Sequence, residues 1–454
     1  MQEEKTTMQA SSGKELTVAM VGLGKMGLPL AVAYLKKGCR VLGCDINQQV
    51  VEAINAGLCH IKEEPGLAGV VADAVARGMF TATQETTSAV RASDVVVVIV
   101  PVVTNEQNEI GFSAIDAATA AIGAGLTPGK LVIYETTLPI GTTAQRLRQQ
   151  LEQCSHLRAG KDFYLAHSPE RVRSGGVLHD LVAYPKVVGG INKASTDAAV
   201  QFYRTVLDAE IIETAHANDA EFVKLIETTY CDVNIALANE FARYADAQGL
   251  DLHAAIAAAN SRPQSHIHEP GIGVGGHCIP VYPHFLLNST PEGLELARRA
   301  RAINNGMATF AIERLEAAFG PLALRSVLIL GITYRGDVRE TFHSAAGILR
   351  KELGERGAAV YAHDPLFSDS DLELLGYTPL KLEDRGNVDT IILQANHRAY
   401  QEWDFHQFPN CRVVLDGRRA LRREQIESCG MVYLTLGGGQ RVRRSAGEPF
   451  RAVS

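Results

Sequence analysis

Short apolar runs alternate with Ala-rich helical stretches through most of this 454-residue chain. Runs that are apolar on both faces and alternate with helices are typical of a parallel sheet with helices on both sides. The sequence therefore predicts an α/β fold with two Rossmann-like, doubly wound parallel sheets. The expected strands are residues 16–21, 40–45, 94–100, 131–135, 162–167 and 186–190 in the first sheet, and 326–331, 359–365, 389–396 and 412–419 in the second.

One long helix is expected between the two sheets, because Asn218 is a good N-cap and Gly249 a good C-cap. Its apolar side chains at helical spacing are Phe222, Leu225, Ile226, Val233, Leu237 and Phe241. The chain is too long for one hydrophobic core, so we expect several domains. They are a disordered tail (1–14), an N-terminal α/β domain (15–212), a central helical domain (213–318), a C-terminal α/β domain (319–440) and a basic tail (441–454).

Charge and composition exclude several classes of protein. The chain has 44 basic and 51 acidic residues, and no basic block precedes residues 441–451, so we expect no nucleic-acid partner. The longest apolar run, from Val95, is too short to span a bilayer, and the polar start lacks the apolar core of a signal peptide, so a cytoplasmic protein without a membrane partner is expected. The eight cysteines lack C-x-x-C spacing, which argues against a metal site and against disulfides.

The stretch "GLGKMG" (22–27) follows an expected strand and opens an expected helix. In that context glycines permit a tight turn, backbone approach to a pyrophosphate and close helix packing. Asp45 ends the next strand, where a carboxylate would bond a ribose hydroxyl and repel a 2′-phosphate, which favours NAD over NADP. A glycine turn without any cofactor is the alternative. The predicted NAD contacts are Gly22, Leu23, Gly24, Lys25, Met26, Gly27 and Asp45.

A second glycine-rich stretch, "GVGGHCIPVYP" (273–283), surrounds Cys278. Glycines at 271, 273, 275 and 276 suit a loop whose backbone approaches a ligand closely. A thiol in such a loop needs a nearby cation before it can act as a nucleophile, and Lys224 on the long helix is a candidate. The residues alone leave two other readings open: a buried structural thiol for Cys278 and a surface lysine for Lys224.

Six motifs resemble those of the nucleotide-sugar 6-dehydrogenases, the UDP-glucose/GDP-mannose dehydrogenase family, from about Leu16 to Leu421. They are "GLGKMGLP", "YETTLPIGTT", "HSPERV", "EFVKLIETTYCDVNIALANEFA", "GVGGHCIP" and "LGITYRGDVRET". The segments "PERV", "DVNIALANE" and "GGHCIP" look like the branch that oxidises UDP-N-acetylhexosamines. The resemblance implies two-step, NAD-dependent oxidation of the sugar C6 alcohol of UDP-GlcNAc or UDP-ManNAc to a uronic acid, without release of the aldehyde.

Carried over from that family, Cys278 is the nucleophile that forms a thiohemiacetal and then a thioester. Lys224 would stabilise the oxyanion at C6, while Glu170 and Thr137 would hold the water and serve as general base. Without the resemblance, Glu170 reads as a loop acid paired with Arg171, and Thr137 as a residue that satisfies backbone at a strand end.

Three positions depart from the family pattern. Thr228 stands where the family usually has asparagine, and Tyr282 where it has aspartate; both are counted with the catalytic set. Phe342 replaces an arginine that usually reaches the cofactor, and we expect Arg339, or alternatively His343, to take over that contact.

The resemblance also implies a substrate site in a cleft between the two sheets, and at least a homodimer formed through the central helical domain. Arg262 would reach into the partner's site, although by spacing alone it could be a surface arginine. The implied substrate contacts are Glu170, Arg171, Val172, Lys224, Arg262, Gly275, Gly276, His277, Arg335 and Arg418, and Pro101 and Thr137 join the NAD contacts. The alternatives are a UDP-glucose 6-dehydrogenase, a β-hydroxyacid-type enzyme that transfers one hydride, and a non-catalytic nucleotide-sugar binder.

Overall fold

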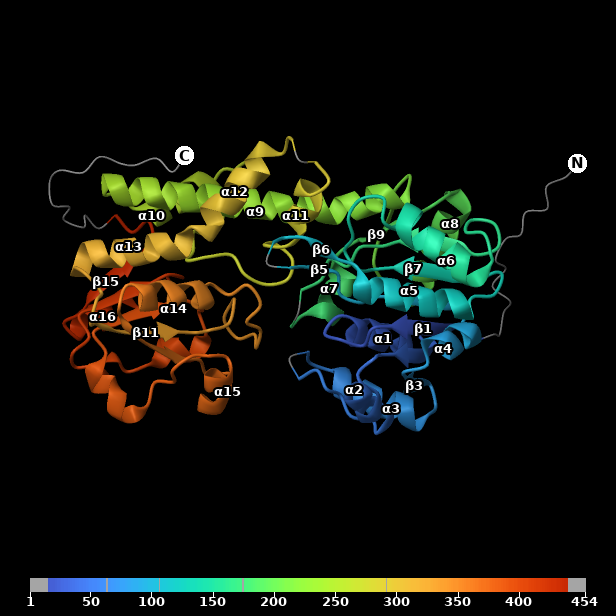
Figure 1. The fold of residues 1–454 in the computed structure, drawn as a ribbon, viewed down its shortest axis with the longest axis horizontal. Helices are drawn as coiled ribbons and strands as arrows, with labels where there is room; N and C mark the ends of the chain where they lie inside the picture. Colours follow the sequence, from blue (N-terminus) through green and yellow to red (C-terminus); the bar gives the residue numbers. More distant parts are fainter. Residues whose placement is uncertain (1–14, 63, 106, 174, 291, 440–454) are drawn as a thin grey trace, which may run out of the picture. The chain divides into compact units, whose positions relative to one another are not determined.

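The computed structural model describes residues 15–439 apart from 63, 106, 174 and 291 (Figure 1). The tails expected at 1–14 and 441–454 lie outside the described residues. The chain divides into two compact units, Met1–Glu227 with His284–Ser289, and Thr228–Pro283 with Thr290–Ser454. The chain therefore passes between the units at three places, and the first of these lies within the long helix.

Unit 1 is built on an eight-stranded sheet in the order β10-β9-β8-β7-β4-β1-β2-β3. The strands are β1 (Thr17–Val21), β2 (Arg40–Cys44), β3 (Phe80–Thr83), β4 (Val95–Val98), β7 (Leu131–Tyr134), β8 (Tyr164–His167), β9 (Lys186–Gly190) and β10 (Ile211–Glu213). Neighbouring strands are parallel except β8 and β9, which pair antiparallel. The six expected strands are confirmed, but burial on both faces does not distinguish strand direction, so this reversal was not expected.

The helices of unit 1 connect these strands. They are α1 (Gly27–Lys36), α2 (Gln48–Asn55), α3 (Leu67–Ala76), α4 (Thr86–Ala92), α5 (Ser113–Gly125), a π-helical turn η1 (Thr143–Leu147), α6 (Arg148–Ser155), α7 (Val177–Ala183) and α8 (Lys193–Val206), while β5 (Val103–Thr104) and β6 (Ile110–Gly111) form a short antiparallel pair. Alternate sheet residues such as Val18, Met20 and Val97 join the apolar faces of α1, α3 and α8 in one buried core. This core holds the carboxyl ends of β1 and β2 in place.

Unit 2 contains a five-stranded parallel sheet in the order β12-β11-β13-β14-β15. Its strands are β11 (Ser326–Leu330), β12 (Ala359–His363), β13 (Thr390–Leu393), β14 (Val413–Asp416) and β15 (Val432–Thr435). One face packs on α13 (Met307–Phe319) and α14 (Ala345–Glu355), and the other on α16 (Arg423–Ser428) and two short 3-10 turns (Arg398–Glu402 and Phe405–Gln407). A helix α15 (Asp369–Leu374) and a 3-10 turn (Leu382–Asn387) complete the connections. The sheet confirms the second predicted α/β block and adds β15 to it.

The expected long helix is α9 (Ala217–Gln248), which is followed by α10 (Leu252–Asn260), α11 (Tyr282–Leu287) and α12 (Glu295–Asn305). Gly249 ends α9 in the left-handed region, with φ +71°, as predicted. The predicted N-cap is wrong. Asn218 lies inside the first turn and donates its backbone N–H to His216 Nδ1 at 3.3 Å, so a histidine ring supplies the acceptor expected from the asparagine.

Helix α9 carries a stripe of large apolar residues on its exposed side. At 100° per residue, the apolar residues of one stripe fall within an arc of about 100° on the helix. Their side chains are nevertheless exposed: Phe222, Ile226, Tyr230, Leu237, Phe241 and Tyr244. The opposite face buries alanines together with polar residues, namely Glu221, Lys224, Thr228, Asp232 and Asn239. The apolar spacing predicted the helix correctly, but only Leu225 of the six predicted residues is buried and Val233 is partly buried; Phe222, Ile226, Leu237 and Phe241 are exposed.

Two absences hold for the described part of the chain. None of its helices has both the length and the apolar character needed to cross a membrane. It also contains no group of three or more His, Cys, Asp or Glu side chains arranged to hold a metal ion. All eight cysteines fall within the described residues, and each is a free thiol.

Candidate active site

The three glycines of residues 22–27 have different surroundings. Gly22 has φ +98°, and a Cβ there would lie 2.5 Å from the Ile99 carbonyl oxygen. A Cβ on Gly27 would collide with the Gly22 carbonyl. Gly24 has no such constraint, because no described atom lies within 4 Å of the position its Cβ would take. The fold itself requires Gly22 and Gly27, whereas Gly24 leaves its backbone open to a ligand such as a pyrophosphate.

Asp45 follows β2 and is fixed by two backbone donors. Its Oδ2 accepts the Leu23 N–H at 2.9 Å, and its Oδ1 accepts the Asn47 N–H at 2.9 Å. An ionised carboxylate can accept about four hydrogen bonds, so capacity remains for ribose hydroxyls. Together with the open backbone at Gly24, this carboxylate fits NAD.

The other predicted cofactor contacts of unit 1 lie near the same edge of the sheet. Lys25 and Met26 complete the turn that opens α1 and are partly exposed, and Pro101 is exposed after β4. The segment that holds Pro101 is tied to the segment after β7, because Thr136 Oγ1 donates to the Val100 carbonyl at 2.8 Å. Thr137 is buried next to that bond.

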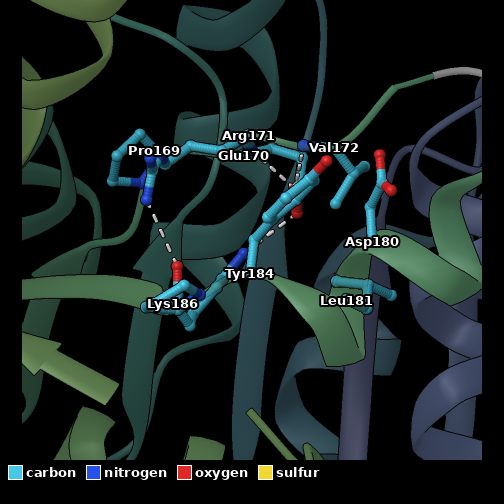
Figure 2. Close-up of a pocket in the computed structure, with 9 residues that line it drawn as sticks. Pro169, Glu170, Arg171, Val172, Asp180, Leu181, Tyr184 and Lys186 are labelled. Carbon is cyan, nitrogen blue, oxygen red and sulfur yellow. Dashed lines mark hydrogen bonds and ion pairs between the residues drawn. The ribbon is translucent and has the colours of Figure 1, made fainter. Parts of the chain in front are cut away.

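Glu170 lies after β8 and is nearly buried. Its Oε1 accepts the backbone N–H groups of Arg171 at 2.7 Å and Val172 at 3.0 Å. The Arg171 guanidinium does not pair with this acid; it binds Glu227 on α9 through two contacts of 3.1 Å. The alternative of a Glu170–Arg171 ion pair is therefore wrong. Figure 2 shows Glu170, Arg171 and Val172 along one wall of a small pocket.

Lys224 is only 7% exposed, so the reading of a surface lysine is also wrong. The helix turns that flank it are anchored. Three residues earlier, Glu221 accepts the backbone N–H groups of Gly141 at 2.5 Å and Thr143 at 2.7 Å. Three residues later, Glu227 holds Arg171. Within unit 1 these bonds join the Lys224 helix to the segments that follow Thr137 and Glu170, so three of the predicted catalytic residues lie in connected segments.

The remaining catalytic candidates belong to unit 2. Thr228 is buried one helical turn after Lys224, on the same face of α9. Cys278 is partly exposed, unlike Cys39, Cys44 and Cys411, where burial raises the pKa of the thiol to about 11, 12 and 12. The Cys278 carbonyl accepts the Tyr282 N–H at 2.9 Å, at the start of α11. Cys278 is therefore not a fully buried structural thiol.

The glycines around Cys278 make room for protein atoms. A Cβ on Gly275 would lie 2.6 Å from both the His343 carbonyl oxygen and Tyr334 Cβ, and Gly276 has φ +90° against the Tyr334 ring. Gly271 and Gly273 are similarly close to Arg418 and Ala345. The close backbone approach that the sequence predicted is thus made to the protein's own C-terminal block, and contact of Gly275 and Gly276 with substrate stays a prediction.

Phe342, the departure from the family arginine, packs on this loop. Its ring stacks on His277 with centroids 4.2 Å apart and planes 6° apart, and its carbonyl accepts the Gly276 N–H at 2.8 Å. His277 Nε2 also lies 3.3 Å from Glu340 Oε2. Burial raises the pKa of the Tyr334 hydroxyl against the effect of the neighbouring Arg335. The segment 334–345 therefore holds the loop that carries Cys278.

The predicted arginines lie at different places. Arg339 donates to the Leu366 carbonyl at 3.0 Å and pairs with Asp371 at 3.1 Å, so its guanidinium is engaged within unit 2. Arg418 donates to the carbonyls of Gln394 at 2.8 Å and Gly273 at 3.3 Å. Arg335 lies over the Tyr334 ring, with its guanidinium carbon 5.7 Å from the centroid.

Arg262 is exposed on the turn after α10. Within the described chain no side chain pairs with it. His343 adopts φ +51°, and burial lowers the pKa of its imidazole.

Comparison with known proteins places these features in a family. The chain is 32% identical over 435 residues to a UDP-N-acetyl-D-mannosamine dehydrogenase of Pyrococcus horikoshii, a match that covers 93% of this chain and all of the relative. Family models match the NAD binding domain at 16–207, the central domain at 218–306 and the UDP binding domain at 328–423. The chain belongs to the UDP-glucose/GDP-mannose dehydrogenase family. It is an NAD-dependent nucleotide-sugar dehydrogenase whose small-molecule partner is a UDP-sugar.

Other relatives carry related names. An NDP-N-acetyl-D-galactosaminuronic acid dehydrogenase of Ralstonia solanacearum is 33% identical over 410 residues, which cover 88% of this chain and 95% of the relative. The solved structure of the Pyrococcus horikoshii UDP-D-ManNAc dehydrogenase superposes with a TM-score of 0.84 at 31% identity, covering 93% of this chain and 100% of that one. A UDP-glucose dehydrogenase of Pyrobaculum islandicum superposes with a TM-score of 0.84 at 25% identity, covering 94% and 99%.

Sequence reasoning missed the buried charges beside Glu170. Glu135 directly follows β7, and Lys186 begins β9, a strand buried at every position. Their carboxylate and ammonium groups lie 2.6 Å apart. A charged residue at the end of an otherwise apolar strand was the available signal, because buried charges need partners.

Proposed function

We propose that this enzyme oxidises the C6 alcohol of a UDP-N-acetylhexosamine, UDP-GlcNAc or UDP-ManNAc, to the uronic acid in a four-electron reaction. The observation that carries the proposal is Cys278, partly exposed in a glycine loop whose sequence matches the family motif. Names of the relatives support the sugar class, since they include UDP-N-acetyl-D-mannosamine and NDP-N-acetyl-D-galactosaminuronic acid dehydrogenases.

The chemistry divides between NAD and the protein's side chains. Residues 22–27 and Asp45 would hold NAD, which would supply the two-electron acceptor for each of two oxidations. Between them the Cys278 sulfur adds to the C6 aldehyde as a thiohemiacetal, which the second oxidation converts to a thioester. The water oxygen then bonds to C6 as the C–S bond breaks, and one water proton goes to the Cys278 sulfur while the other goes to solvent.

Five further residues act around C6 in this scheme. The buried ammonium of Lys224 stabilises the oxyanion that develops at C6, a role for which a fixed charge in a water-poor site is effective. Glu170 and Thr137 hold the hydrolytic water. Thr228 and Tyr282 occupy the family's asparagine and aspartate positions, and we count them with Glu170 and Thr137 in the catalytic set.

The domain roles follow the family models. We assign NAD to residues 15–212, catalysis and dimerisation to 213–318, and the UDP-sugar to 319–440, in line with matches at 16–207, 218–306 and 328–423. A cytoplasmic location stays a prediction.

We further infer a homodimer through the central helical domain. The exposed apolar stripe of α9 is the supporting observation, because a helix face of this kind gains free energy when a second apolar surface covers it. Arg262, exposed after α10, is the residue proposed to reach the partner's substrate.

The test is NADH yield with a panel of limiting nucleotide sugars: UDP-GlcNAc, UDP-ManNAc, UDP-GalNAc, UDP-glucose and GDP-mannose. We expect two NADH per sugar with UDP-GlcNAc or UDP-ManNAc, and slower turnover with UDP-glucose. One NADH per sugar with free aldehyde would favour a single-hydride dehydrogenase, and sugar binding without NADH would favour a binder.

A further inference from the structure

Lys186 joins two carboxylates inside unit 1. Its Nζ lies 2.6 Å from Glu135 Oε2 and 2.9 Å from Glu170 Oε2, and all three side chains are less than 10% exposed. Figure 2 shows Lys186 and Glu170 lining the same small pocket, although they come from different segments of the chain. The bridge therefore reaches the side chain that the proposed function assigns to water binding.

The contact with Lys186 fixes the orientation of the Glu170 carboxylate. Two backbone N–H groups occupy Oε1, and the Lys186 ammonium occupies one side of Oε2. A carboxylate oxygen accepts two hydrogen bonds, and the Glu135 side chain also interacts with Glu170; we assign the remaining acceptor position of Oε2 to water. Burial would raise the pKa of Glu170, but the Lys186 charge and the hydrogen bonds outweigh it and hold the pKa below its usual range.

Lys186 itself is anchored by Glu135. The hydroxyls of Tyr203 and Tyr34 donate to Glu135 Oε1 at 2.6 and 3.2 Å, and the Tyr203 ring centroid lies 5.3 Å from Nζ. Burial lowers the pKa of Lys186, but the two carboxylates more than offset this, so the group stays charged. Burial raises the pKa of Glu135 against the effect of Lys186.

Of the other described titratable groups near this cluster, only Arg171 carries a positive charge that acts on Glu170, and it does not contact the carboxylate. Burial, reinforced by Lys186, lowers the pKa of His167 to about 3, so its imidazole is neutral. The Arg171 guanidinium is directed to Glu227, and the Cys39 thiol near Tyr34 is held neutral by burial. Among the described residues, Lys186 is thus the cation that contacts both acids.

We propose that Lys186 is a positioning residue that keeps Glu170 an ionised, fixed acceptor for the water that hydrolyses the Cys278 thioester, with Glu135 as its second anchor. The inference rests on the proposed function and deepens it. It assigns Glu170 the orientation of water, and it assigns the charge state of Glu170 to Lys186, which acts through Glu170.

The test is the pH profile of kcat for three variants. Lys186→Met removes the ammonium at similar side-chain length, so burial raises the pKa of Glu170; the acid limb of kcat moves to higher pH and kcat at pH 7 falls about 100-fold, with KM little changed. Lys186→Arg keeps the charge and restores the wild-type profile. Glu135→Gln keeps a hydrogen-bonding group but removes the carboxylate that competes with Glu170 for the Lys186 ammonium, so the acid limb moves to lower pH.

Opposite shifts in Lys186→Met and Glu135→Gln would not arise from a cluster that only stabilises the fold, for which both variants would lower the melting temperature and leave the profile alone. An acid limb unmoved in Lys186→Met, or unmoved or moved upward in Glu135→Gln, would overturn the inference. If Lys186→Met fails to fold, the Glu135→Gln and Lys186→Arg profiles decide it by the same criteria. Failure of the proposed function would instead appear in the wild type, as absence of two NADH per sugar.

Discussion

Gly24 lacks a side chain for a different reason from Gly22 and Gly27. The outer glycines are required by the protein, since a Cβ on either would meet backbone of the same unit. A Cβ on Gly24 would meet no atom of the described structure, so a substitution there tests ligand binding rather than folding. Within these six residues, Gly22 and Gly27 serve the fold and Gly24 serves NAD binding.

We predict that Gly24→Ala lowers NAD affinity about tenfold or more while the melting temperature stays near that of the wild type, because the new methyl group meets only the cofactor's pyrophosphate. The matched control is Gly27→Ala, which should lose about 1–3 kcal/mol of stability from forced overpacking. Isothermal titration with NAD and thermal unfolding measure the two effects. Equal stability loss in both variants would show that Gly24 also serves the fold.

The elements themselves were largely predictable. Strands such as β4 and β11 are buried on both faces, so an apolar run identified them without knowledge of partners. An apolar run does not indicate the direction of a strand, so the antiparallel pairing of β8 with β9 became visible only in the structure.

The candidate site was predictable only in part. The family motifs gave Cys278, Lys224 and Glu170, but the Glu135–Lys186 bridge joins residues 51 apart in sequence, and such pairing has no local pattern. The glycines near Cys278 show the same limit, because a glycine that faces a ligand and one that faces Tyr334 read alike in sequence.

At the scale of one helix, the apolar stripe of α9 predicts how the chain assembles. Ile226→Glu combined with Phe241→Glu should convert a dimer to a monomer of 49.0 kDa, because two charges would be buried without partners in the interface. Both side chains are exposed in the single chain, so unfolding is not expected. Light scattering after size exclusion gives the mass.

The control for that experiment is Leu374→Glu, the same kind of change at an 87% exposed leucine on α15. It should leave the dimer intact. A wild-type chain that is monomeric at micromolar concentration, or a dimer that survives the double substitution, would contradict assembly through α9.

At the scale of the whole molecule, the same turn follows the first strand of each sheet, β1 in unit 1 and β11 in unit 2, but its aspartate has different partners in the two units. Gly22 N–H bonds the Cys44 carbonyl at 2.8 Å, and Gly331 N–H bonds the His363 carbonyl at 2.8 Å. In both units an aspartate after the second strand accepts the next N–H, from Leu23 at 2.9 Å and from Ile332 at 2.8 Å.

The two aspartates differ in what else they bind. Asp364 is buried, and its Oδ2 also lies 3.1 Å from His397 Nε2, so the protein itself engages this carboxylate. Asp45 is partly exposed and retains capacity for ribose hydroxyls. The repeat therefore supports NAD binding in unit 1 and a different nucleotide contact in unit 2, in agreement with the family models for the two blocks.

The central claim is that one sulfur carries the sugar between two oxidations. The most direct measurement is NADH and uronic acid formed per limiting UDP-N-acetylhexosamine, for the wild type, Cys278→Ser and the control Cys154→Ser, which alters an exposed thiol of unit 1. We predict two NADH and one uronic acid per sugar for the wild type and for Cys154→Ser, and at most one NADH with no uronic acid for Cys278→Ser. Two NADH and one uronic acid per sugar from Cys278→Ser would contradict the covalent mechanism.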